Sequence, residues 1–398
     1  METKINFIID IGMPPLLEEL KSYGGTVVIL KEKNHLEEDF VHKLEDNVLK
    51  IDMKSLSSIE DFDKAIEIIN EYEIGSLDYI FPFNERKYDI YWEFIKKYKI
   101  KSNLKEAYVK NSKKSEGRRL VNEVFNDVMS SELTNIDIEN FKFPCIIKPL
   151  KGNGSTDITK IKNKDELEKF IEENDTSNYF VEEFISGKEI SIEAIHYKGN
   201  HLIYGVTRKI KYEDSFVEEG HIADYYRLND QQLSKVKKIY DILDYDNTVS
   251  HSEFMLLDDG IVMIESHPRL GGDLIPSFYE SKFETNLYEV FVKCLMGDLY
   301  EGEKINELKY TMFSIFPIPS HFPSKIYLDD SNKEELETNY GINLIIQNKE
   351  NGTLINKSPE DSFDRPLTLR GCVDKSINID EHIAKIKEYC IDNIFNNL

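Results

Sequence analysis

The sequence predicts an α/β protein that begins with a parallel, doubly wound sheet. Short apolar runs with the length of buried strands alternate with segments whose apolar residues recur at helical spacing. Strands that alternate with helices predict parallel strands joined by helical crossovers that cover both faces of the sheet. The strands are expected at residues 5–10, 27–30 and 79–83, and the helices around residues 16–20, 62–69 and 90–95.

After residue 104 the pattern changes to a mixture of helices and antiparallel strands, so the whole chain is expected to be α/β (α+β). Apolar segments at 190–196 and 201–207 flank the turn at Lys198 and predict a hairpin. An acidic loop is expected at 213–225. Further helices are expected at 105–126, 164–173, 231–243, 283–295 and 379–395, and further strands at 143–148, 179–185, 312–317, 342–346 and 367–373.

The charge of the chain excludes some classes of partner. Its 398 residues include 74 acidic and 50 basic side chains, which give a formal net charge of −24. Nonspecific binding to nucleic acid or to an anionic membrane needs clustered Lys and Arg, so neither partner is expected. A small anion remains compatible with this charge, because a local cluster of cations decides its binding.

Nothing in the sequence indicates export or a membrane span. The first residues lack a basic segment followed by a long apolar region, and no apolar run reaches about 18 residues. The four cysteines lack metal or redox spacing, and three of them lie in apolar contexts typical of small core residues. The simplest interpretation is a soluble cytoplasmic protein.

Two apolar runs joined by the turn 258–260 predict a second hairpin. Glu253 lies on the first run and Glu265 on the second, so the two carboxylates are expected to face each other across paired strands. Facing carboxylates repel unless a cation lies between them, and hard oxygen ligands suit Mg²⁺ that bridges phosphates. We therefore expect both glutamates to bind Mg²⁺ or Mn²⁺.

A run of polar residues and glycines follows Glu265. Arg269 is expected beside the metal, where its guanidinium can neutralise an anionic reaction centre. Gly271 and Gly272 let the backbone approach a ligand closely. His267 lies between Glu265 and Arg269, and two roles are open for it: coordinating the metal or orienting Glu265.

A glycine-rich loop follows a buried strand that ends at Lys148. The ammonium group of Lys148 must find an anion or reach water, because a buried charge is costly. The loop that follows contains Gly152, Gly154, Ser155 and Thr156, whose backbone N–H groups and hydroxyls can converge on phosphate oxygens. The segment is neither a Walker A loop nor a dinucleotide fingerprint.

These motifs together resemble the ATP-grasp superfamily. The strand, Lys-Pro and mobile glycine-rich loop are similar to its nucleotide lid, and Glu265-x-His267 followed by Arg269 is similar to its metal and catalytic segment. His267 stands where that segment usually has Asn. The spacing of Glu265, Arg269 and Gly-Gly most resembles the bacilysin-type L-amino-acid ligases. The resemblance implies an ATP-grasp fold with a doubly wound pre-ATP-grasp domain (1–104), a lid and nucleotide-binding subdomain (105–188), and a C-terminal catalytic domain with a biotin-carboxylase-like tail (189–398).

The resemblance also implies how ATP is bound. Glu182 is expected at the adenine amino group, and the backbone of Glu183, Phe184 and Ile185 against the purine. Glu189 corresponds to the acid that accepts hydrogen bonds from the ribose hydroxyls.

Other site residues come from the same resemblance. Lys114 fits the lysine near the lid entrance, with Lys113 as the alternative. Arg208 or Lys209 could reach the transferred phosphate. His221 is the candidate for a histidine near the substrate, with a structural or exposed histidine as the alternative. Arg269, His221, Gly271 and Gly272 form the expected catalytic set.

The implied activity is an ATP-dependent carboxylate–amine ligase. An acyl phosphate would form from a small carboxylate and ATP, and an amine would then displace phosphate; both substrates are expected to be amino acids. A carboxylase or purine-pathway ligase of the same fold is one alternative, and a non-catalytic nucleotide-binding protein is another. Homodimers are frequent in relatives, so a homodimer is one possible state, and the sequence leaves the oligomeric state open.

Overall fold

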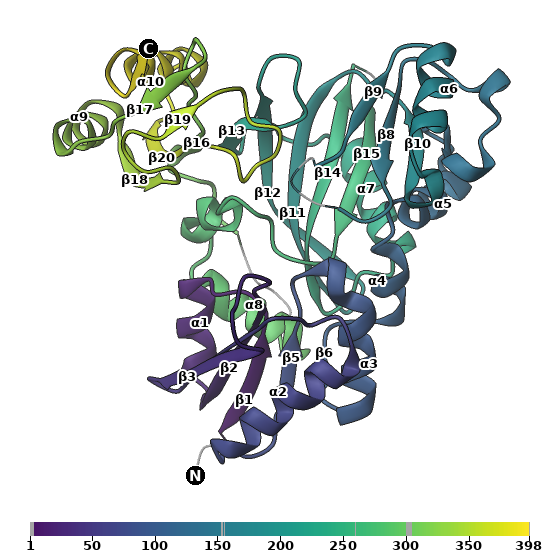
Figure 1. The fold of residues 1–398 in the computed structure, drawn as a ribbon, viewed down its shortest axis with the longest axis vertical. Coiled ribbons are helices and arrows are strands. Elements are labelled where there is room, and N and C mark those ends of the chain that lie inside the picture. Colours follow the sequence, from purple (N-terminus) through teal and green to yellow (C-terminus); the bar gives the residue numbers. More distant parts are fainter. Residues whose placement is uncertain (1–3, 153, 155, 259, 300–304, 398) are drawn as a thin grey trace.

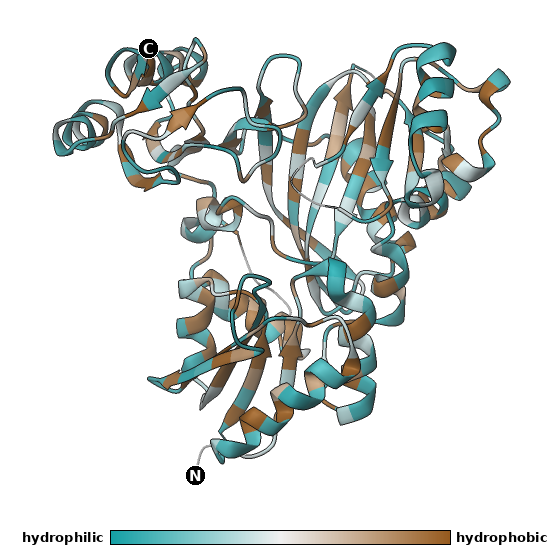
Figure 2. Ribbon diagram, in the orientation of Figure 1, coloured by the Kyte–Doolittle hydropathy of each residue, from teal (hydrophilic) through white to brown (hydrophobic). Residues whose placement is uncertain are grey.

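The computed structural model describes residues 4–152, 154, 156–258, 260–299 and 305–397. An N-terminal α/β domain lies below a large central sheet in Figure 1, with the lid at the upper right and the C-terminal subdomain at the upper left. Figure 2 shows hydrophobic residues along the strands and hydrophilic residues on much of the surrounding helices.

The N-terminal domain contains the predicted doubly wound sheet. The strand order is β3-β4-β2-β1-β5-β6, and all neighbouring pairs are parallel except β3 with β4. The strands are β1 (Ile5–Ile9), β2 (Gly24–Glu32), β3 (Phe40–Glu45), β4 (Val48–Met53), β5 (Tyr79–Phe81) and β6 (Lys101–Ser102).

Helices cover both faces of this sheet because the apolar strands are buried on both sides. Phe7 and Ile9 of β1 pack into one core with α1, and Ile8 packs into another with α2 and α3. The strand β3 was not predicted, since its side chains lie almost entirely at the surface and give no apolar alternation. The helices are α1 (Pro14–Lys21), α2 (Ile59–Glu71), η1 (Glu85–Lys87) and α3 (Tyr88–Tyr98).

The lid is a separate four-stranded antiparallel sheet with the order β7-β10-β8-β9. It has a small core of its own that includes Ile147, Leu167 and Val181. Its elements are β7 (Ser130–Glu132), η2 (Leu133–Asn135), η3 (Ile138–Asn140), β8 (Cys145–Pro149), β9 (Thr159–Ile161), α6 (Lys164–Glu173), η4 (Thr176–Asn178) and β10 (Tyr179–Glu183).

The central sheet is antiparallel, with the order β15-β14-β11-β12-β13-β16-β20-β18. Both predicted hairpins, β11–β12 and β14–β15, are confirmed in it. Helices α5 (Lys114–Val124) and α7 contact β15, and α8 contacts β11 and β14. The elements are β11 (Lys188–Tyr197), β12 (Asn200–Lys211), β13 (Glu218–Ala223), α7 (Asp230–Ile242), β14 (Thr248–Leu257), β15 (Gly260–His267), η5 (Ile275–Lys282) and α8 (Leu287–Met296).

Two predictions about local structure are wrong. Half of the expected acidic loop is the strand β13, because its acids are paired with cations instead of being solvated: Glu218 with Lys209 and Glu219 with Lys387. The single helix expected at 105–126 is two helices, α4 (Glu106–Asn111) and α5 (Lys114–Val124), separated at Ser112 and Lys113. The break lets Lys114 begin a helix beside the lid.

The C-terminal segment extends the central sheet and adds a small subdomain with its own core. Strands β16, β20 and β18 continue the sheet, and β19-β17-β21 form a second, three-stranded sheet. The predicted domain boundaries at 104 and 188 stay a prediction. The elements are β16 (Tyr310–Ile315), β17 (Ser324–Ile326), α9 (Asp330–Tyr340), β18 (Ile342–Gln347), β19 (Leu354–Ile355), β20 (Leu367–Asp374), α10 (Ile379–Asn393) and β21 (Phe395–Asn397).

The cysteines agree with the expectation that most of them are small core residues. Cys145, Cys294 and Cys390 are buried free thiols, and Cys372 is partly buried. Among the described residues, no helix combines the length and the apolar character that a bilayer crossing requires.

A buried histidine pair in the central sheet predicts a pH dependence of stability. His196 is fully buried, shares a 2.7 Å contact with His201, and contacts Ser250 at 2.7 Å beside the rings of Tyr240 and Tyr245. Burial, together with His201, holds the pKa of His196 well below its ordinary value of 6.5. The unfolded chain therefore binds a proton more readily than the folded chain, so this contribution is present above pH 6.5 and lost below it.

We expect the free energy of unfolding to fall by up to about 1.4 kcal/mol for each pH unit below 6.5 through this group. Urea unfolding of the parent and of His196→Gln between pH 7.5 and 5.0 tests this. The variant should be less stable at pH 7.5 but lose less stability on acidification. Parallel pH profiles for the two proteins would contradict the assignment.

Candidate active site

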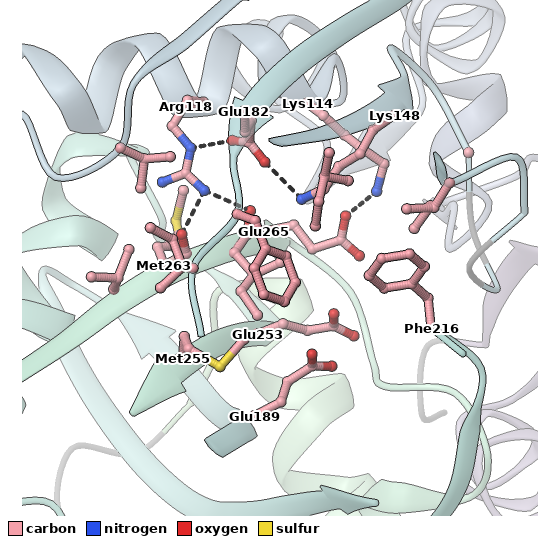
Figure 3. Close-up of a pocket in the computed structure, with 18 of the residues that line it drawn as sticks. Lys114, Arg118, Lys148, Glu182, Glu189, Phe216, Glu253, Met255, Met263 and Glu265 are labelled. Carbon is pink, nitrogen blue, oxygen red and sulfur yellow. Dashed lines mark hydrogen bonds and ion pairs between the residues drawn. The ribbon is translucent and has the colours of Figure 1, made fainter. Parts of the chain in front are cut away.

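Two adjoining cavities lie where the lid, the central sheet and the N-terminal domain meet. The lid cavity, of about 140 Å³, lies between the lid sheet and the hairpin β14–β15 (Figure 3). The central cavity, of about 570 Å³, lies between that hairpin and loops of the N-terminal domain. The two cavities share part of their walls, namely Gly154, Glu218, Glu253 and Glu265.

A buried ion-pair network closes one side of the lid cavity. Lys148 at the end of β8 contacts Glu182 of β10 at 2.7 Å, and Arg118 of α5 donates to the other oxygen of the same carboxylate. Arg118 also donates to the carbonyl of Met263 at 2.6 Å. Burial alone would raise the pKa of Glu182, but Arg118 and Lys148 lower it below its ordinary value. The predicted strand-end lysine thus has a buried anionic partner.

The hinge predicted next to the purine lies at the same cavity. Glu183, Phe184 and Ile185 all line it. The backbone N–H groups of Glu183 and Phe184 donate to the carbonyls of Met129 and Pro144, both at 2.9 Å, so they attach the hinge to the lid sheet. The side chain of Glu183 pairs with Lys142 at 2.7 Å.

Glu189, the predicted ribose acid, lines the lid cavity at the start of β11. Lys211 of the neighbouring strand pairs with it at 2.5 Å. Burial raises the pKa of Glu189 even with Lys211 beside it, and the nearby carboxylate of Glu253 acts in the same direction.

The glycine-rich loop lies at the junction of the cavities. Gly154 has a φ of +66°, a conformation that side chains disfavour, and lines both cavities. Its carbonyl accepts a hydrogen bond of 3.4 Å from the backbone of Ser362 in the C-terminal subdomain. Gly152 and Thr156 line the lid cavity. Ser155, predicted as a phosphate ligand, lies outside the described residues.

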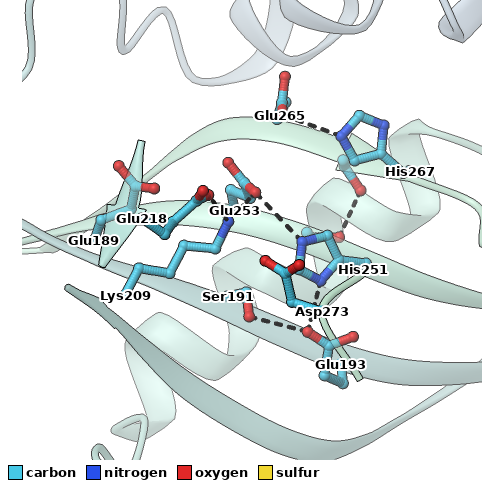
Figure 4. A network of polar contacts seen from close by, with 12 residues as sticks. Glu189, Ser191, Glu193, Lys209, Glu218, His251, Glu253, Glu265, His267 and Asp273 are labelled. Atoms are coloured by element: carbon cyan, nitrogen blue, oxygen red, sulfur yellow. Dashed lines mark hydrogen bonds and ion pairs between the residues drawn. The ribbon is translucent and has the colours of Figure 1, made fainter. Parts of the chain in front are cut away.

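The two predicted acidic residues face each other at the junction. Glu253 of β14 is the register partner of Glu265 of β15 (Figures 3 and 4). Lys209 forms an ion pair with Glu253, and Lys114 forms one with Glu265. Burial raises the pKa of each carboxylate, and repulsion by Glu265 also raises that of Glu253. The lysines and neighbouring histidines outweigh these effects, so both pKa values lie well below 4.5.

Two pairs of alternative site residues, Lys114 or Lys113 and Lys209 or Arg208, differ in whether they line a cavity. Lys114 lines the lid cavity, whereas Lys113 caps helix α5 and does not line either cavity. Lys209 lines the central cavity, whereas Arg208 pairs with Asp380 at 2.7 Å. Successive side chains of a strand point to opposite faces, so Arg208 and Lys209 cannot both reach the site.

Each facing glutamate contacts a histidine two residues away on its own strand (Figure 4). His267 contacts Glu265 at 3.2 Å through Nε2 and Glu85 at 2.6 Å through Nδ1. Both ring nitrogens are therefore engaged by carboxylates. Burial would lower the pKa of His267, but Glu85 and Glu265 raise it above its ordinary value.

His251 was not singled out from the sequence, although it lies on the same face as Glu253 by strand periodicity. It contacts Glu253 at 3.3 Å and the fully buried Glu193 at 2.7 Å. Burial would lower its pKa, but the two carboxylates raise it to about 9.

Arg269 lines the central cavity together with Gly271 and Gly272. Its guanidinium donates to the carbonyl of Leu270 at 2.9 Å and lies 3.5 Å from Glu85. Burial would raise the pKa of Glu85, but His267 and Arg269 lower it to about 2. Glu85 lies in the N-terminal domain and carries no local signal that could have predicted its role.

His221 also lines the central cavity, from strand β13, and is almost fully buried. Its Nδ1 lies 3.3 Å from the hydroxyl of Ser314. Burial lowers the pKa of His221 to about 4, so the ring is neutral at pH 7.

The C-terminal subdomain contributes a buried arginine that the sequence did not reveal. Arg365 contacts Glu218 at 2.9 Å and Asp273 at 2.7 Å, and lies 3.8 Å from the ring centroid of Phe316. Both carboxylates line the central cavity, and so does Phe363 from the same C-terminal loop. Arg365 thus ties the C-terminal subdomain to the cavity wall.

The side chains at the junction fit a hard divalent cation. Within the described part of the chain, no three His, Cys, Asp or Glu side chains are grouped as a complete metal site. Mg²⁺, however, is commonly bound by only one or two carboxylates plus substrate phosphates and water. Glu253 and Glu265 supply two carboxylates, and the ammonium groups of Lys209 and Lys114 already lie against them as cations.

Comparisons with known proteins agree with this geometry. Residues 141–277 match the ATP-grasp domain family. D-alanine–D-alanine ligase of Flavobacterium johnsoniae is 28% identical over 140 residues, which are 32% of this chain and 43% of that protein. The same enzyme of Christiangramia forsetii is 26% identical over 113 residues, 26% of this chain and 34% of that protein. The chain spans less than half the length of the curated relatives it matches.

Solved structures resemble the whole chain. An L-amino acid ligase from Bacillus licheniformis has a TM-score of 0.76 at 16% identity, covering 99% of this chain and 98% of that one. N5-carboxyaminoimidazole ribonucleotide synthetase from Thermotoga maritima has a TM-score of 0.67 at 16% identity, covering 97% and 98%. The protein therefore contains an ATP-grasp domain, and its whole chain has an ATP-grasp fold.

Replacing Arg118 is expected to lower the stability of the protein strongly. Arg118→Met leaves Glu182 with one fewer buried cation and should lower the free energy of unfolding by about 3 kcal/mol. Arg119→Met on the same helix is the matched control, because Arg119 pairs with Glu116 and Glu123 at the surface and should change stability little. Urea unfolding measures both. Equal effects of the two substitutions would contradict the role given to Arg118.

Proposed function

We propose that this protein is an ATP-dependent carboxylate–amine ligase that acts on small molecules, with amino acids as its substrates. The observation that carries the proposal is the meeting of two cavities at Glu253 and Glu265. A nucleotide in the lid cavity would direct its terminal phosphate at a substrate in the central cavity. The ATP-grasp fold and the ligases among the similar proteins support this assignment.

The lid cavity suits a nucleotide. Apolar side chains such as Phe184 and Met255 line it and would enclose the purine, with Glu182 at the adenine amino group. Glu189 would accept hydrogen bonds from the ribose hydroxyls. Lys148 now pairs with Glu182 and would turn from it to contact the phosphates.

Lys114 would change partner when the nucleotide binds. It now pairs with Glu265, and the phosphates would offer it an alternative anion. The backbone of the loop that includes Gly152 and Gly154 would close over the phosphates and exclude water, which would otherwise hydrolyse a reactive intermediate.

Mg²⁺ or Mn²⁺ held by Glu253 and Glu265 would neutralise charge on the β and γ phosphates. We propose that His267 orients Glu265 instead of binding the metal, because both of its ring nitrogens already contact carboxylates.

In the first step an oxygen of the substrate carboxylate attacks the γ-phosphorus, and the bond to the β-phosphate oxygen breaks. ADP leaves and an acyl phosphate remains. Lys209 lies on the central-cavity side of Glu253, where it would contact the transferred phosphoryl group. Phosphorylation is needed because phosphate is a far better leaving group than a carboxylate oxygen.

In the second step the amine nitrogen attacks the acyl carbon and forms a tetrahedral oxyanion. Arg269 and the backbone N–H groups near Gly271 and Gly272 would stabilise this oxyanion. The C–O bond to phosphate then breaks, and the leaving phosphate takes the proton that the nitrogen loses. His221 is neutral at pH 7 and would accept a hydrogen bond from the amine.

The proposed location of the protein is the cytoplasm. A ligase that consumes ATP and has buried free thiols suits the reducing cytoplasm. The homodimer suggested by the sequence stays a prediction.

Arg269→Ala is the direct test of the ligation step. The variant should bind ATP almost normally, because Arg269 lines the central cavity and not the lid cavity, yet amide formation should fall by about 10²–10³-fold. Arg208→Ala is the matched control, since Arg208 pairs with Asp380 outside both cavities. Product formation at the parental rate in Arg269→Ala would disprove the assigned role.

A screen of ADP release over pairs of amino acids, with bicarbonate as a separate addition, separates the candidate functions. We expect turnover that depends on a particular amino-acid pair and yields one phosphate per amide. Turnover that requires bicarbonate would instead indicate a carboxylase-type reaction. Nucleotide binding without turnover under any condition would indicate a non-catalytic protein.

A further inference from the structure

The two facing glutamates are supported by two matching chains of side chains. In each chain an inner glutamate contacts Nδ1 of a histidine, and Nε2 of that histidine contacts the outer glutamate at the cavity. Figure 4 shows the chain from Glu193 through His251 to Glu253. The histidines, His251 and His267, are register partners on β14 and β15, as are the outer glutamates. Their rings are nearly parallel, with an angle of 11° and centroids 6.3 Å apart. The inner residues are Glu193 of β11 and Glu85 of the N-terminal domain.

The chain through His251 has no contact with the cavities at its inner end. Glu193 is fully buried and lines neither the lid cavity nor the central cavity. Ser191 donates to its Oε1 at 3.0 Å, and its Oε2 is buried without a hydrogen-bond partner among the described residues. A carboxylate in this position cannot touch a substrate, so its contact with His251 must act on the histidine.

Gly271 packs directly against this chain. A Cβ atom at this position would lie 2.8 Å from Nδ1 of His251 and 3.1 Å from Oε2 of Glu193. The first distance is too short for any real Cβ contact, so a side chain here would displace the histidine. The backbone at Gly271 therefore closes the space around His251 and prevents the ring from rotating away.

We propose that Glu193 and His251 are positioning residues that hold Glu253 in the orientation needed to bind a divalent cation, and that Glu85 and His267 do the same for Glu265. This inference rests on the proposed function. A glutamate side chain has several rotatable bonds, and a ring held at both ends removes much of this freedom. Outer partners of metal ligands commonly change metal affinity by about 10–100-fold when they are removed.

The two carboxylate oxygens of Glu265 have different partners. His267 contacts Oε1, and the ammonium group of Lys114 contacts Oε2. The histidine thus takes one oxygen and leaves the other directed at a cation. At Glu253 the arrangement differs, because His251 and Lys209 both contact Oε1.

Binding of Mn²⁺ to the full-length protein, measured by electron paramagnetic resonance with a nonhydrolysable ATP analogue, tests the proposal. Glu193→Gln keeps the shape of the buried side chain but removes its charge. His251→Asn removes the imidazole ring that contacts both Glu193 and Glu253. Each should raise the dissociation constant of Mn²⁺ by about 10–100-fold. Binding of the analogue without metal should stay close to the parental value.

His201→Asn is the matched control, because His201 is also buried on the central sheet but lines neither cavity. Its Mn²⁺ affinity should stay parental. Glu253→Gln is the reference for the metal site itself and should weaken Mn²⁺ binding at least as much as the positioning variants.

The outcomes separate this inference from the proposed function. If Glu253→Gln weakens Mn²⁺ binding while Glu193→Gln and His251→Asn do not, the metal site stands and the positioning role is wrong. If Glu253→Gln has no effect, the metal site fails and the positioning role fails with it. Should His251→Asn not fold, Glu193→Gln alone decides, and an effect equal to that of His201→Asn overturns the proposal.

Discussion

The repulsion between two facing carboxylates is the constraint on which the centre of this protein depends. Glu253 and Glu265 are register partners on one hairpin and are mostly buried at the junction of the two cavities, where water screens their charges less than at the surface. Two such charges are tolerated only if cations surround them. Lys209 and Lys114 meet this need. The buried glutamates and lysines therefore stabilise one another. The same arrangement leaves two carboxylates side by side where a divalent cation would bind.

Three parts of the chain contribute to this balance from different directions. Glu85 reaches in from the N-terminal domain and contacts both His267 and Arg269. Gly154 of the lid lines both cavities, and the C-terminal subdomain is joined to the central cavity through Arg365. Any movement of one part relative to another would change the surroundings of the two carboxylates. An acyl phosphate intermediate would benefit from such an enclosed site, because water is its competing nucleophile.

The sequence predicted much of the fold and part of the site, and the failures have physical causes. Parallel strands with helices over the first domain and both hairpins were predictable, because buried strands and tight turns leave local patterns. The strand β3 was missed because its side chains are mostly exposed. The segment at β13 was wrongly predicted as part of a loop, because acidic residues suggest solvent unless their cationic partners are known.

The sequence was enough to predict that Glu253 and Glu265 lie on paired strands of one hairpin, because a short turn between apolar runs is a local pattern. Their exact pairing needed the structure: the register of the turn would pair Glu253 with Ile264, and a register shift between Glu253 and Phe254 makes Glu265 the partner instead. Which residues support the two glutamates likewise depends on how distant parts of the chain pack. Glu85 lies 182 positions from His267, and Glu193 lies 58 positions from His251. Side-chain contacts at such separations follow from how sheets and domains pack together, and this packing leaves no local pattern of spacing to detect.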